Sequence, residues 1–373
     1  MNLADEFPLE PSLCYLNHAA VAPWPTRTAE AVKRFGHENN LWGATHYPDW
    51  LKIEKLLREQ CRLLLNADST NDIALVKNTS EGLSMVAYGL PWQSGDNLII
   101  SDEEFPSNRI VWESLRSKGV SVKEVSLKGN NPEADIIAAV DQHTRLISLS
   151  SVQYASGFRL HLEPIGQFCA RNNILFCVDA IQSLGALPFD VQAIQADFVV
   201  ADGHKWLLGP EGLALFYSSP QGRAQLALSE YGWHMVEAAG DYTNRSWAVA
   251  PSARRFECGS PNMLSIHALS ASMSLLLELG IDQVHTQLEA NVRYLIEKIL
   301  AHGQLELLST TQNSRLAGIV TFKHSAIDSV RLHQQLMEQH IICAHRGGGI
   351  RFSPHFYTPK EVLDRAVQAI PKK

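Results

Sequence analysis

Two neighbouring stretches of the chain decide its fold: residues 177–182 read CVDAIQ, and residues 197–209 read DFVVADGHKWLLG. Each begins as a short apolar run, and polar side chains follow where the run ends. Asp179 closes the first run, and Lys205 comes shortly after the second. The carboxyl ends of parallel strands meet at one edge of a sheet, where α/β proteins bind their ligands. We therefore expect Asp179 and Lys205 to lie at the same edge of one sheet.

The same alternation of apolar run and helical segment extends on both sides of these stretches. Several runs are apolar without alternation, which indicates strands whose two faces are both covered by helices. The order predicts an α/β fold whose large domain has a mostly parallel seven-stranded sheet sandwiched by helices. A helix over residues 48–65 precedes the strands, because apolar residues recur there at spacings of three and four. The predicted strands are residues 73–76, 97–100, 120–125, 146–150, 174–178, 197–200 and 213–217.

A chain of 373 residues is suited to two domains, and its pattern changes after residue 224. Residues 224–261 break the alternation and read as a connector. The later segments are typical of a smaller C-terminal α+β domain. We expect helices over 263–279, 282–302 and 359–370, and strands over 317–322, 341–344 and 350–352. The predicted division is an N-terminal segment, 1–20, that packs with the small domain, a large domain, 21–250, and a small domain, 251–373.

Composition excludes several classes of protein. The net charge of −7 argues against a nucleic-acid partner, which usually requires a basic excess. The six cysteines form no C-x-x-C pair, so we expect reduced thiols and no metal site. Residues 1–11 are acidic and lack the apolar segment of a signal peptide, and no stretch approaches the ~20 apolar residues of a membrane span. We expect a soluble, cytoplasmic protein without a membrane partner.

An amine and a carboxylate at the same sheet edge suit a pyridoxal phosphate site. The Lys205 amine can bind the aldehyde of that cofactor covalently, and Asp179 can keep its pyridine nitrogen protonated, so that the ring withdraws electrons. Each residue alone also has an ordinary explanation, Asp179 as a helix cap and Lys205 as a surface lysine. The combination, with glycines on both sides of Lys205, favours the cofactor site and makes both residues candidate catalytic groups.

Three motifs carry a resemblance to a known family: Asp-x-x-Gln at residues 179–182, Gly-His-Lys at 203–205 and YLNHAA at 15–20. They resemble the class V branch of the fold-type I pyridoxal phosphate enzymes, which includes cysteine desulfurases, kynureninases, isopenicillin N epimerases and several aminotransferases. The resemblance covers nearly the whole chain. It implies that the large domain binds pyridoxal 5'-phosphate, but it is not specific for one reaction.

A phosphate cradle is expected where residues 77–82, KNTSEG, follow a strand and open a helix. Backbone amides at such a helix N-terminus, together with the hydroxyls of Thr79 and Ser80, can hold a dianion. The alternative is an ordinary capping box. The resemblance assigns this segment to the cofactor phosphate and implies a further phosphate contact from His204.

Other segments are expected to contact the cofactor ring. Phe105, in EFPSN of residues 104–108, falls where related enzymes stack an aromatic side chain on the pyridine; the alternative is a core position. From SVQYASG of residues 151–157 the resemblance implies a contact from Gln153 or Tyr154, and the choice stays open. Gln182 should approach the same side unless it is purely structural. The predicted cofactor-binding set is Thr79, Ser80, Phe105, Gln153, Tyr154, Asp179, Gln182, Asp202, His204, Lys205 and Ser260.

Two further segments concern the partner subunit and the substrate. RFECGSPN of residues 255–262 is similar to a family element whose hydroxyl residue, here Ser260, reaches the phosphate of the partner subunit, which implies a homodimer with shared active sites. Taken alone, these letters describe a turn. The resemblance also implies that Arg351 binds the α-carboxylate of an amino acid or amine substrate, because arginine holds carboxylates through two parallel hydrogen bonds. Arg346 is a second candidate, and His18 is expected to line the substrate side.

The reaction is less determined than the cofactor. Desulfurases of the family carry a mobile cysteine in the loop before the carboxylate-binding arginine. Here residues 346–349 read RGGG, and Cys343 lies in an apolar run where an inert thiol is expected. We expect an aminotransferase, with a C–S or C–C lyase or an epimerase as the alternative. A nucleotide-dependent enzyme is disfavoured by the missing G-x-G-x-x-G motif. A catalytically silent binding protein with the same fold is the remaining alternative.

Overall fold

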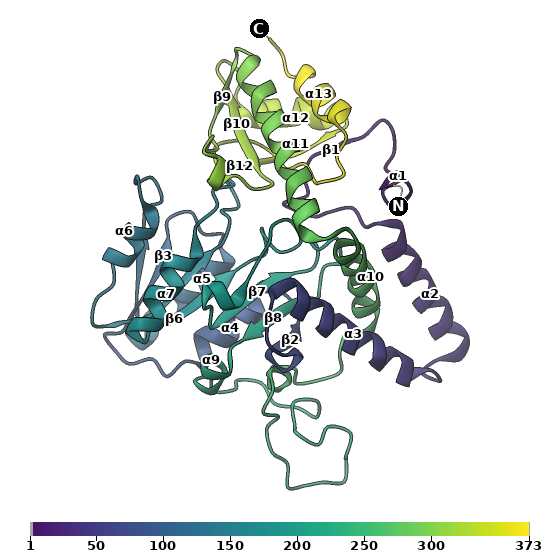
Figure 1. The fold of residues 1–373 in the computed structure, drawn as a ribbon, viewed down its shortest axis with the longest axis vertical. Helices are drawn as coiled ribbons and strands as arrows, with labels where there is room; N and C mark the ends of the chain where they lie inside the picture. Colours follow the sequence, from purple (N-terminus) through teal and green to yellow (C-terminus); the bar gives the residue numbers. More distant parts are fainter. Residues whose placement is uncertain (1–2, 373) are drawn as a thin grey trace.

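The computed structural model describes residues 3–372, which form a large sheet and a smaller sheet with helices around them (Figure 1). The large sheet has the strand order β2-β8-β7-β6-β5-β3-β4. Strand β8 runs antiparallel to β2 and β7, and the other neighbouring pairs are parallel. This confirms the predicted α/β fold with a mostly parallel seven-stranded sheet. Its strands are β2 (Ile73–Val76), β3 (Asn97–Ser101), β4 (Ser121–Val125), β5 (Thr144–Ser150), β6 (Leu175–Asp179), β7 (Phe198–Asp202) and β8 (Ala214–Ser218).

Apart from the edge strand β4, the strands of the large sheet are buried on both faces, which explains why most of them read as apolar runs without alternation. Phe176 and Val199 belong to a hydrophobic core on one face, whereas Cys177 and Val200 belong to a second core on the other face. Helices cover both faces. Those between the strands are α4 (Thr79–Gly89), α5 (Ser107–Glu113), α6 (Pro132–Ala138), α7 (Leu162–Asn172), α8 (Val191–Ile194) and α9 (Pro220–Ala224).

A group of three long helices packs beside β2. Helices α2 (Thr26–Trp42) and α3 (Tyr47–Leu65) both lie against α10 (Met263–Leu279), which returns from the second half of the chain (Figure 1). The sequence indicated α3 and α10 but not α2. Only Thr28 and Ala31 of α2 are buried, so the helix has no apolar stripe that periodicity could detect.

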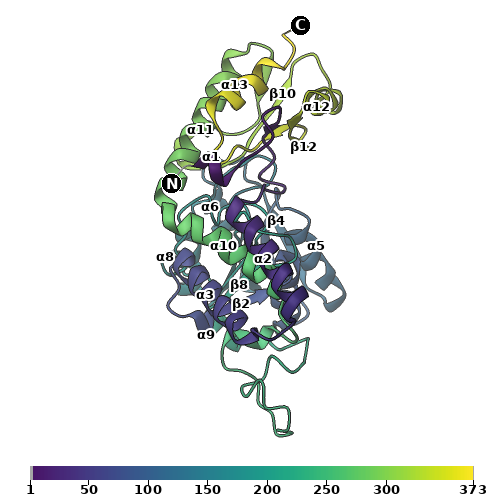
Figure 2. The same ribbon diagram turned by 90° about the vertical axis from the view of Figure 1, so that its right-hand side faces the viewer.

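The smaller sheet is antiparallel and has the order β12-β13-β10-β9. Helix α11 runs from the large sheet to this one, as both views show (Figures 1 and 2). Near it, β1 (Cys14–Tyr15) pairs in parallel with β11 (Ile341–Ile342), which joins the N-terminal segment to the second half of the chain. The predicted strand over 341–344 is thus divided in two. The division into domains at residue 250 stays a prediction. The other elements are α1 (Leu3–Glu6), β9 (Leu305–Leu307), β10 (Val320–His324), β12 (Ala344–Arg346), β13 (Gly349–Phe352), α11 (Ile281–Ala301), α12 (Ser329–Glu338) and α13 (Lys360–Gln368).

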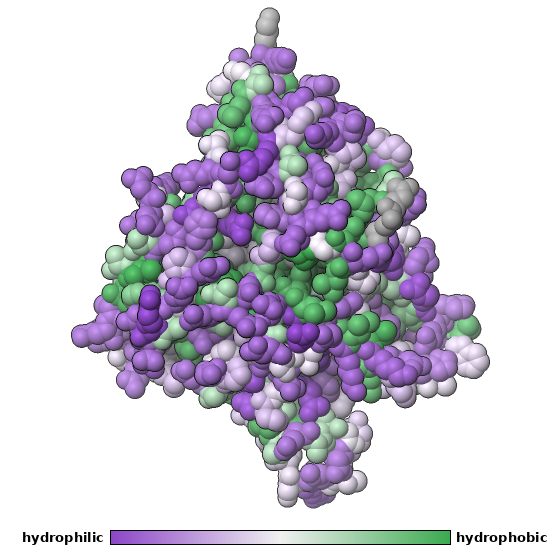
Figure 3. Space-filling view, in the orientation of Figure 1, coloured by the Kyte–Doolittle hydropathy of each residue, from purple (hydrophilic) through white to green (hydrophobic). Residues whose placement is uncertain are grey.

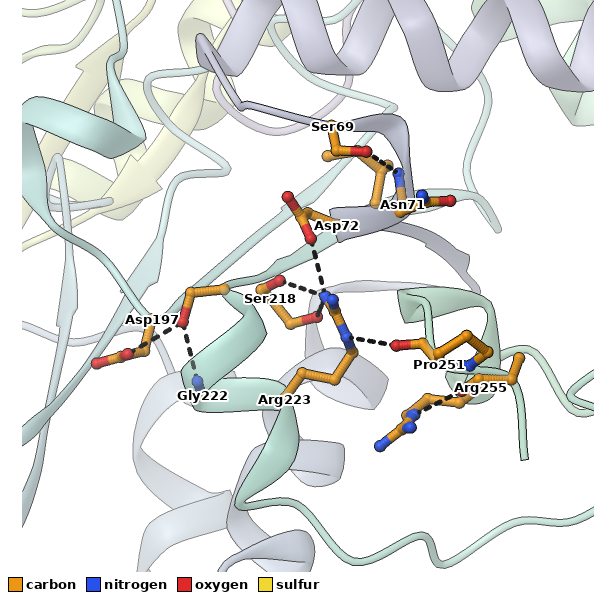
Figure 4. Close-up of polar contacts among 12 residues, drawn as sticks. Ser69, Asn71, Asp72, Asp197, Ser218, Gly222, Arg223, Pro251 and Arg255 are labelled. Atoms are coloured by element: carbon orange, nitrogen blue, oxygen red, sulfur yellow. Dashed lines mark hydrogen bonds and ion pairs between the residues drawn. The ribbon is translucent and has the colours of Figure 1, made fainter. Parts of the chain in front are cut away.

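A long connection between α9 and α10 projects from the body of the molecule at the bottom of Figure 1. Arg223 holds its two ends together (Figure 4). Its guanidinium donates hydrogen bonds to the Ser218 carbonyl at 2.8 Å, to Asp72 at 3.1 Å and to the Pro251 carbonyl at 3.2 Å. Arg223 lies at the start of the connection and Pro251 in its second half, so this contact holds the two parts together, and Asp72 anchors them beside β2.

Hydrophobic side chains gather near the middle of the face shown in Figure 3, below the smaller sheet, within a surface that is otherwise mostly hydrophilic. Within residues 3–372, no single helix is long and apolar enough to cross a membrane. Helices α10 and α11 together are long and apolar enough, but the two helices are bent by 84° where they meet.

Candidate active site

A cavity of about 250 Å³ lies at the carboxyl ends of strands β5, β6 and β7. It brings together side chains from the N-terminal segment, from the large sheet and from the smaller sheet. Most of the residues predicted from the sequence line it. The lining consists of Ala19, Ala20, Asn78, Thr79, Ser80, Phe105, Ser107, Ser150, Val152, Tyr154, Asp179, Ile181, Gln182, Asp202, His204, Lys205, Arg346 and Arg351.

Asp179 and Lys205 face the same cavity, and both are almost completely buried, with exposed fractions of 2% and 8%. Burial lowers the pKa of the Lys205 amine, and the charge of Asp179 opposes this shift. Burial raises the pKa of the Asp179 carboxyl, against the hydrogen bond that it accepts from the Ile181 amide. The charge of each group thus favours the charged form of the other, against the effect of burial. The arrangement places an amine whose pKa is lowered to about 8 beside a carboxyl group in one buried site.

The start of helix α4 forms one wall, and its chemistry fits a phosphate group. The Asn78 side chain caps the helix by accepting a hydrogen bond from the Glu81 amide at 2.9 Å. The Thr79 hydroxyl is buried and has no hydrogen-bond partner among residues 3–372. His204 also lines the cavity, and its Nδ1 lies 2.9 Å from a carboxylate oxygen of Asp202. An unsatisfied hydroxyl at a helix N-terminus is where a dianion binds.

Phe105 and Tyr154 form the aromatic side of the cavity. Their rings meet edge to face, with centroids 5.1 Å apart, and the Lys205 Nζ lies 5.6 Å from the Phe105 centroid. Phe105 is 40% exposed, so it is not a core residue and its face is available to a planar ring. The turn that presents Tyr154 needs Gly157, which has φ of 72°, and a Cβ there would meet the Ile319 carbonyl at 2.5 Å.

Arg351 enters the cavity from β13 of the smaller sheet and is only 2% exposed. Its Nη1 donates to the Tyr154 carbonyl at 2.6 Å, but its Nε is buried without a partner among the described residues. Burial lowers its pKa to about 10, and the nearby charge of Arg346 adds to the effect. Arg346, on β12, is exposed at the rim. An incompletely satisfied guanidinium in a dry pocket is a binding site for a carboxylate.

Three predicted residues are not brought into this cavity. Gln153 is fully buried, and its Nε2 donates to the Ser150 carbonyl at 3.3 Å, whereas the adjacent Tyr154 lines the cavity. His18 is fully buried, bonded to the Ser353 carbonyl at 2.7 Å and to Tyr357 at 2.8 Å, and it leaves the lining to Ala19 and Ala20. Ser260 lies on the wall of a separate cavity beside Lys77 and Glu81.

Gln182 lines the cavity, but both ends of its side-chain amide already form hydrogen bonds. Its Nε2 donates to the Ala19 carbonyl at 3.0 Å, and its Oε1 accepts from the Trp206 indole at 2.8 Å. The side chain therefore ties the N-terminal segment to the turn that carries Lys205. Both interpretations of this residue, structural and cofactor-facing, agree with this position.

Glu104 is a buried carboxyl group that the sequence did not indicate as functional. It accepts hydrogen bonds from the Ser101 hydroxyl at 2.8 Å, the Asn108 amide at 2.8 Å and both the backbone and hydroxyl of Ser150, at 2.9 Å and 2.5 Å. Its charge also contributes to the raised pKa of Asp179. The available signal was its place in an acidic turn, Asp102 to Glu104, that follows the buried strand β3. The network fixes the turn that carries Phe105.

Replacing Glu104 with glutamine should destabilise the protein by about 1–3 kcal/mol, because the new amide group opposes donors that are already oriented toward a carboxylate. Urea denaturation of the cofactor-free protein measures the loss as a lower midpoint. The exposed Glu124 on β4 provides the matched control, and Glu124→Gln should leave the midpoint unchanged. Equal midpoints for both variants would contradict the buried network.

A family model described as Aminotransferase class-V matches residues 14–362. Among curated relatives, a "probable cysteine desulfurase" of Methanothermobacter thermautotrophicus is 28% identical, over 96% of this chain and 94% of the relative. An "uncharacterized aminotransferase YcbU" of Bacillus subtilis is 29% identical over 90% and 88%. A "cysteine desulfurase" of Salmonella typhimurium is 28% identical over 85% and 80%.

Solved structures share the fold over the whole chain. A complex between the cystine C–S lyase C-DES and its reaction product cysteine persulfide has a TM-score of 0.90 and 23% identity, and covers 98% of both chains. The apo structure of the cysteine desulfurase from Thermococcus onnurineus has a TM-score of 0.87 and 21% identity, and covers 98% of this chain and 95% of that one. At this level of identity the likeness concerns the fold alone.

Proposed function

The chain belongs to the class V aminotransferase family, and from this premise we propose that it is a pyridoxal 5'-phosphate-dependent C–S lyase acting on a cystine-like amino acid. Pyridoxal 5'-phosphate is the cofactor, and the unsatisfied Thr79 hydroxyl, the helix start beside it and the Lys205–Asp179 pair fit its phosphate, aldehyde and ring nitrogen. The names of several relatives support cleavage of a C–S bond over amino transfer, the first expectation from the sequence.

The observation that carries the proposal is a pocket that joins Lys205, Asp179 and Arg351 and has no thiol on its wall among residues 3–372. Cys343 is buried, and burial raises its pKa to about 12. Cys258 is the least buried cysteine, but it lies in the separate cavity of Ser260. Transfer of sulfur to a cysteine of the enzyme therefore lacks an acceptor. Elimination requires none.

Each of these residues has a distinct role in such an elimination. Arg351 binds the substrate carboxylate through the donors that it leaves unsatisfied, and Phe105 supports the face of the planar cofactor ring. The cofactor, when bound, withdraws electrons from the substrate Cα. Asp179, on the cavity wall, would hold the ring nitrogen of the bound cofactor in its protonated form. The Lys205 amine removes the Cα proton as general base.

The proposed reaction is balanced, and water is its only co-reactant. The Cα–H bond breaks toward Lys205, and the Cβ–S bond breaks with its electron pair staying on sulfur, which takes up a proton. Water then hydrolyses the unsaturated amine. With cystine the products are pyruvate, ammonia and cysteine persulfide. The last of these is the reaction product bound in the C-DES complex.

A product assay tests the function. The loaded enzyme is incubated separately with cystine, with cysteine and with alanine plus a keto acid, and pyruvate, ammonia and sulfane sulfur are measured. We expect equimolar pyruvate, ammonia and sulfane sulfur from cystine. Alanine formed from cysteine would identify a desulfurase, and a keto acid without ammonia would identify a transaminase; either would overturn the proposal. Cys343→Ser and Cys258→Ser should retain the activity.

The pH dependence of cofactor loading provides a further prediction. Only the neutral amine attacks an aldehyde, and burial lowers the pKa of Lys205 from 10.5 to about 8 in the cofactor-free chain. The neutral fraction therefore rises as the pH passes upward through about 8. We expect the rate at which added pyridoxal phosphate attaches to rise over the same range, followed by absorbance. A rate that rises only near pH 10.5 would indicate an ordinary exposed lysine.

The homodimer with shared sites and the cytoplasmic location stay proposals. Ser260 is exposed and does not line the active-site cavity of its own chain, which supports a contact with a partner subunit. Sedimentation of the loaded protein tests the dimer.

A further inference from the structure

A second cavity, of about 760 Å³, lies beside the candidate active site and is larger than it. The two cavities share Val152 as a wall. Ser151 and Ser183, in the turns after β5 and β6, also line the second cavity. Its volume falls in the range of ~300–1,000 Å³ that small-molecule sites occupy. None of the roles described above uses it.

Arg159 supplies the second cavity with a positive charge that lacks a partner. The side chain is half-buried, and its guanidinium makes no hydrogen bond or ion pair to any residue between 3 and 372. The neighbouring Arg315 is different, because Glu133 pairs with it at 2.8 Å. The charge of Glu289 favours the protonated form of Arg159, but Glu289 already forms an ion pair with Arg293 at 2.6 Å. A partly desolvated cation without a counter-ion favours binding of an anion.

The acidic groups on the rim do not neutralise Arg159. Asp190 accepts hydrogen bonds from the Gln192 and Ala193 amides, at 2.8 Å and 2.9 Å, and so caps helix α8. Its other oxygen accepts from Asn66 at 2.9 Å. Glu163 is exposed on the first turn of α7. The cation is therefore left for a ligand from solution.

Apart from His161, the remaining wall of the cavity is apolar. Leu160, Leu187 and Phe189 line it, and all three are at most 8% exposed. A ligand that satisfies the guanidinium and also covers these side chains must combine an anionic group with an apolar body. We propose that this cavity is a binding site for a small organic carboxylate with an apolar body, held by Arg159.

A ligand in this position would contact the turns that present Asp179 to the active site. The Ser151 hydroxyl lies 2.7 Å from that of Ser183, and it donates to the Asp179 carbonyl at 3.2 Å. The Ser151 amide donates to the same carbonyl at 2.9 Å. The second cavity thus abuts the hydrogen bonds that fix the end of β6, and a ligand there is in position to alter the surroundings of the bound cofactor.

Calorimetric titration of the loaded enzyme with 4-phenylbutyrate tests the site, with its uncharged amide as the comparison probe. We expect saturable binding of one carboxylate per chain, at least tenfold weaker binding of the amide, and at least tenfold weaker binding of the carboxylate to Arg159→Gln. Arg145→Gln, at an exposed arginine outside the cavity, should bind like the wild type. Leu187→Trp, which fills the cavity, should also lose binding.

The active-site arginine supplies the remaining control, because the probe carries a carboxylate. Arg351→Gln should still bind 4-phenylbutyrate. Binding that is lost in Arg351→Gln and kept in Arg159→Gln would place the probe in the active site and overturn the proposal. No saturable heat with the wild type at millimolar probe, or equal affinities for the carboxylate and the amide, would overturn it as well. The test measures binding, so its outcome is independent of whether the enzyme is a C–S lyase.

Discussion

Lys205→Ala is expected to abolish covalent attachment of pyridoxal phosphate and to reduce turnover by about 10⁴-fold or more, since proton transfer by a positioned base alone contributes up to about 10⁴-fold. Lys205 lies on the cavity wall with Asp179 and is 8% exposed, so its amine is held where attachment occurs. Borohydride reduction followed by mass measurement of the chain detects the attachment, and the product assay with cystine detects the turnover.

Two controls separate the chemistry of the amine from damage to the fold. Lys128→Ala removes an exposed lysine and should keep both signals. Added methylamine should restore part of the turnover of Lys205→Ala, because a small amine can accept the proton in the space that the side chain leaves. Cofactor fixed to the Lys205→Ala chain by borohydride would show that another lysine carries it, and would refute the assignment.

Most strands of the large sheet could be located from the sequence because both of their faces are buried; the exceptional edge strand β4 is partly exposed. The ends of the predicted runs and the observed strands differ by at most two residues: 73–76 matches Ile73–Val76, and 174–178 is shifted by one from Leu175–Asp179. The reversal of β8 could not be foreseen, since an apolar run such as 213–217 carries no sign of direction. Helix α2 was not predicted because only two of its side chains are buried, so its sequence shows no apolar periodicity.

The sequence predicted the site residues that follow the ends of strands. It did not predict which side chains within a turn face the cavity. Asp179 and Lys205 share a cavity because parallel strands end at one edge. Gln153 and Tyr154 are adjacent, and only the path of the turn, fixed by Gly157, brings Tyr154 to the wall. Glu104 accepts hydrogen bonds from the nearby Ser101 and Asn108 and from the distant Ser150, and no local sequence pattern indicates the contact with Ser150.

Asp179 shows how burial links stability to catalysis in this site. Burial raises its pKa from 3.8 to about 7 in the folded, cofactor-free chain. Between these values the folded state binds more protons than the unfolded state, so the free energy of unfolding falls as the pH rises. The carboxyl thus weakens the cofactor-free fold at neutral pH, and a positively charged group beside it would relieve that cost. A protonated ring nitrogen supplies such a charge.

Asp179→Asn should therefore change stability and turnover in opposite directions. The neutral amide avoids burial of a charge, so the cofactor-free variant should be more stable than the wild type, by a margin that grows as the pH rises from 3.8 to about 7. Turnover should fall by about 10²–10³-fold, the usual cost of removing one electrostatic contact to the transition state. Urea denaturation at several pH values and the product assay measure the two effects. Asp68→Asn, at an exposed site, should change neither. Full turnover with Asn at 179 would mean that this carboxylate does not hold the ring proton.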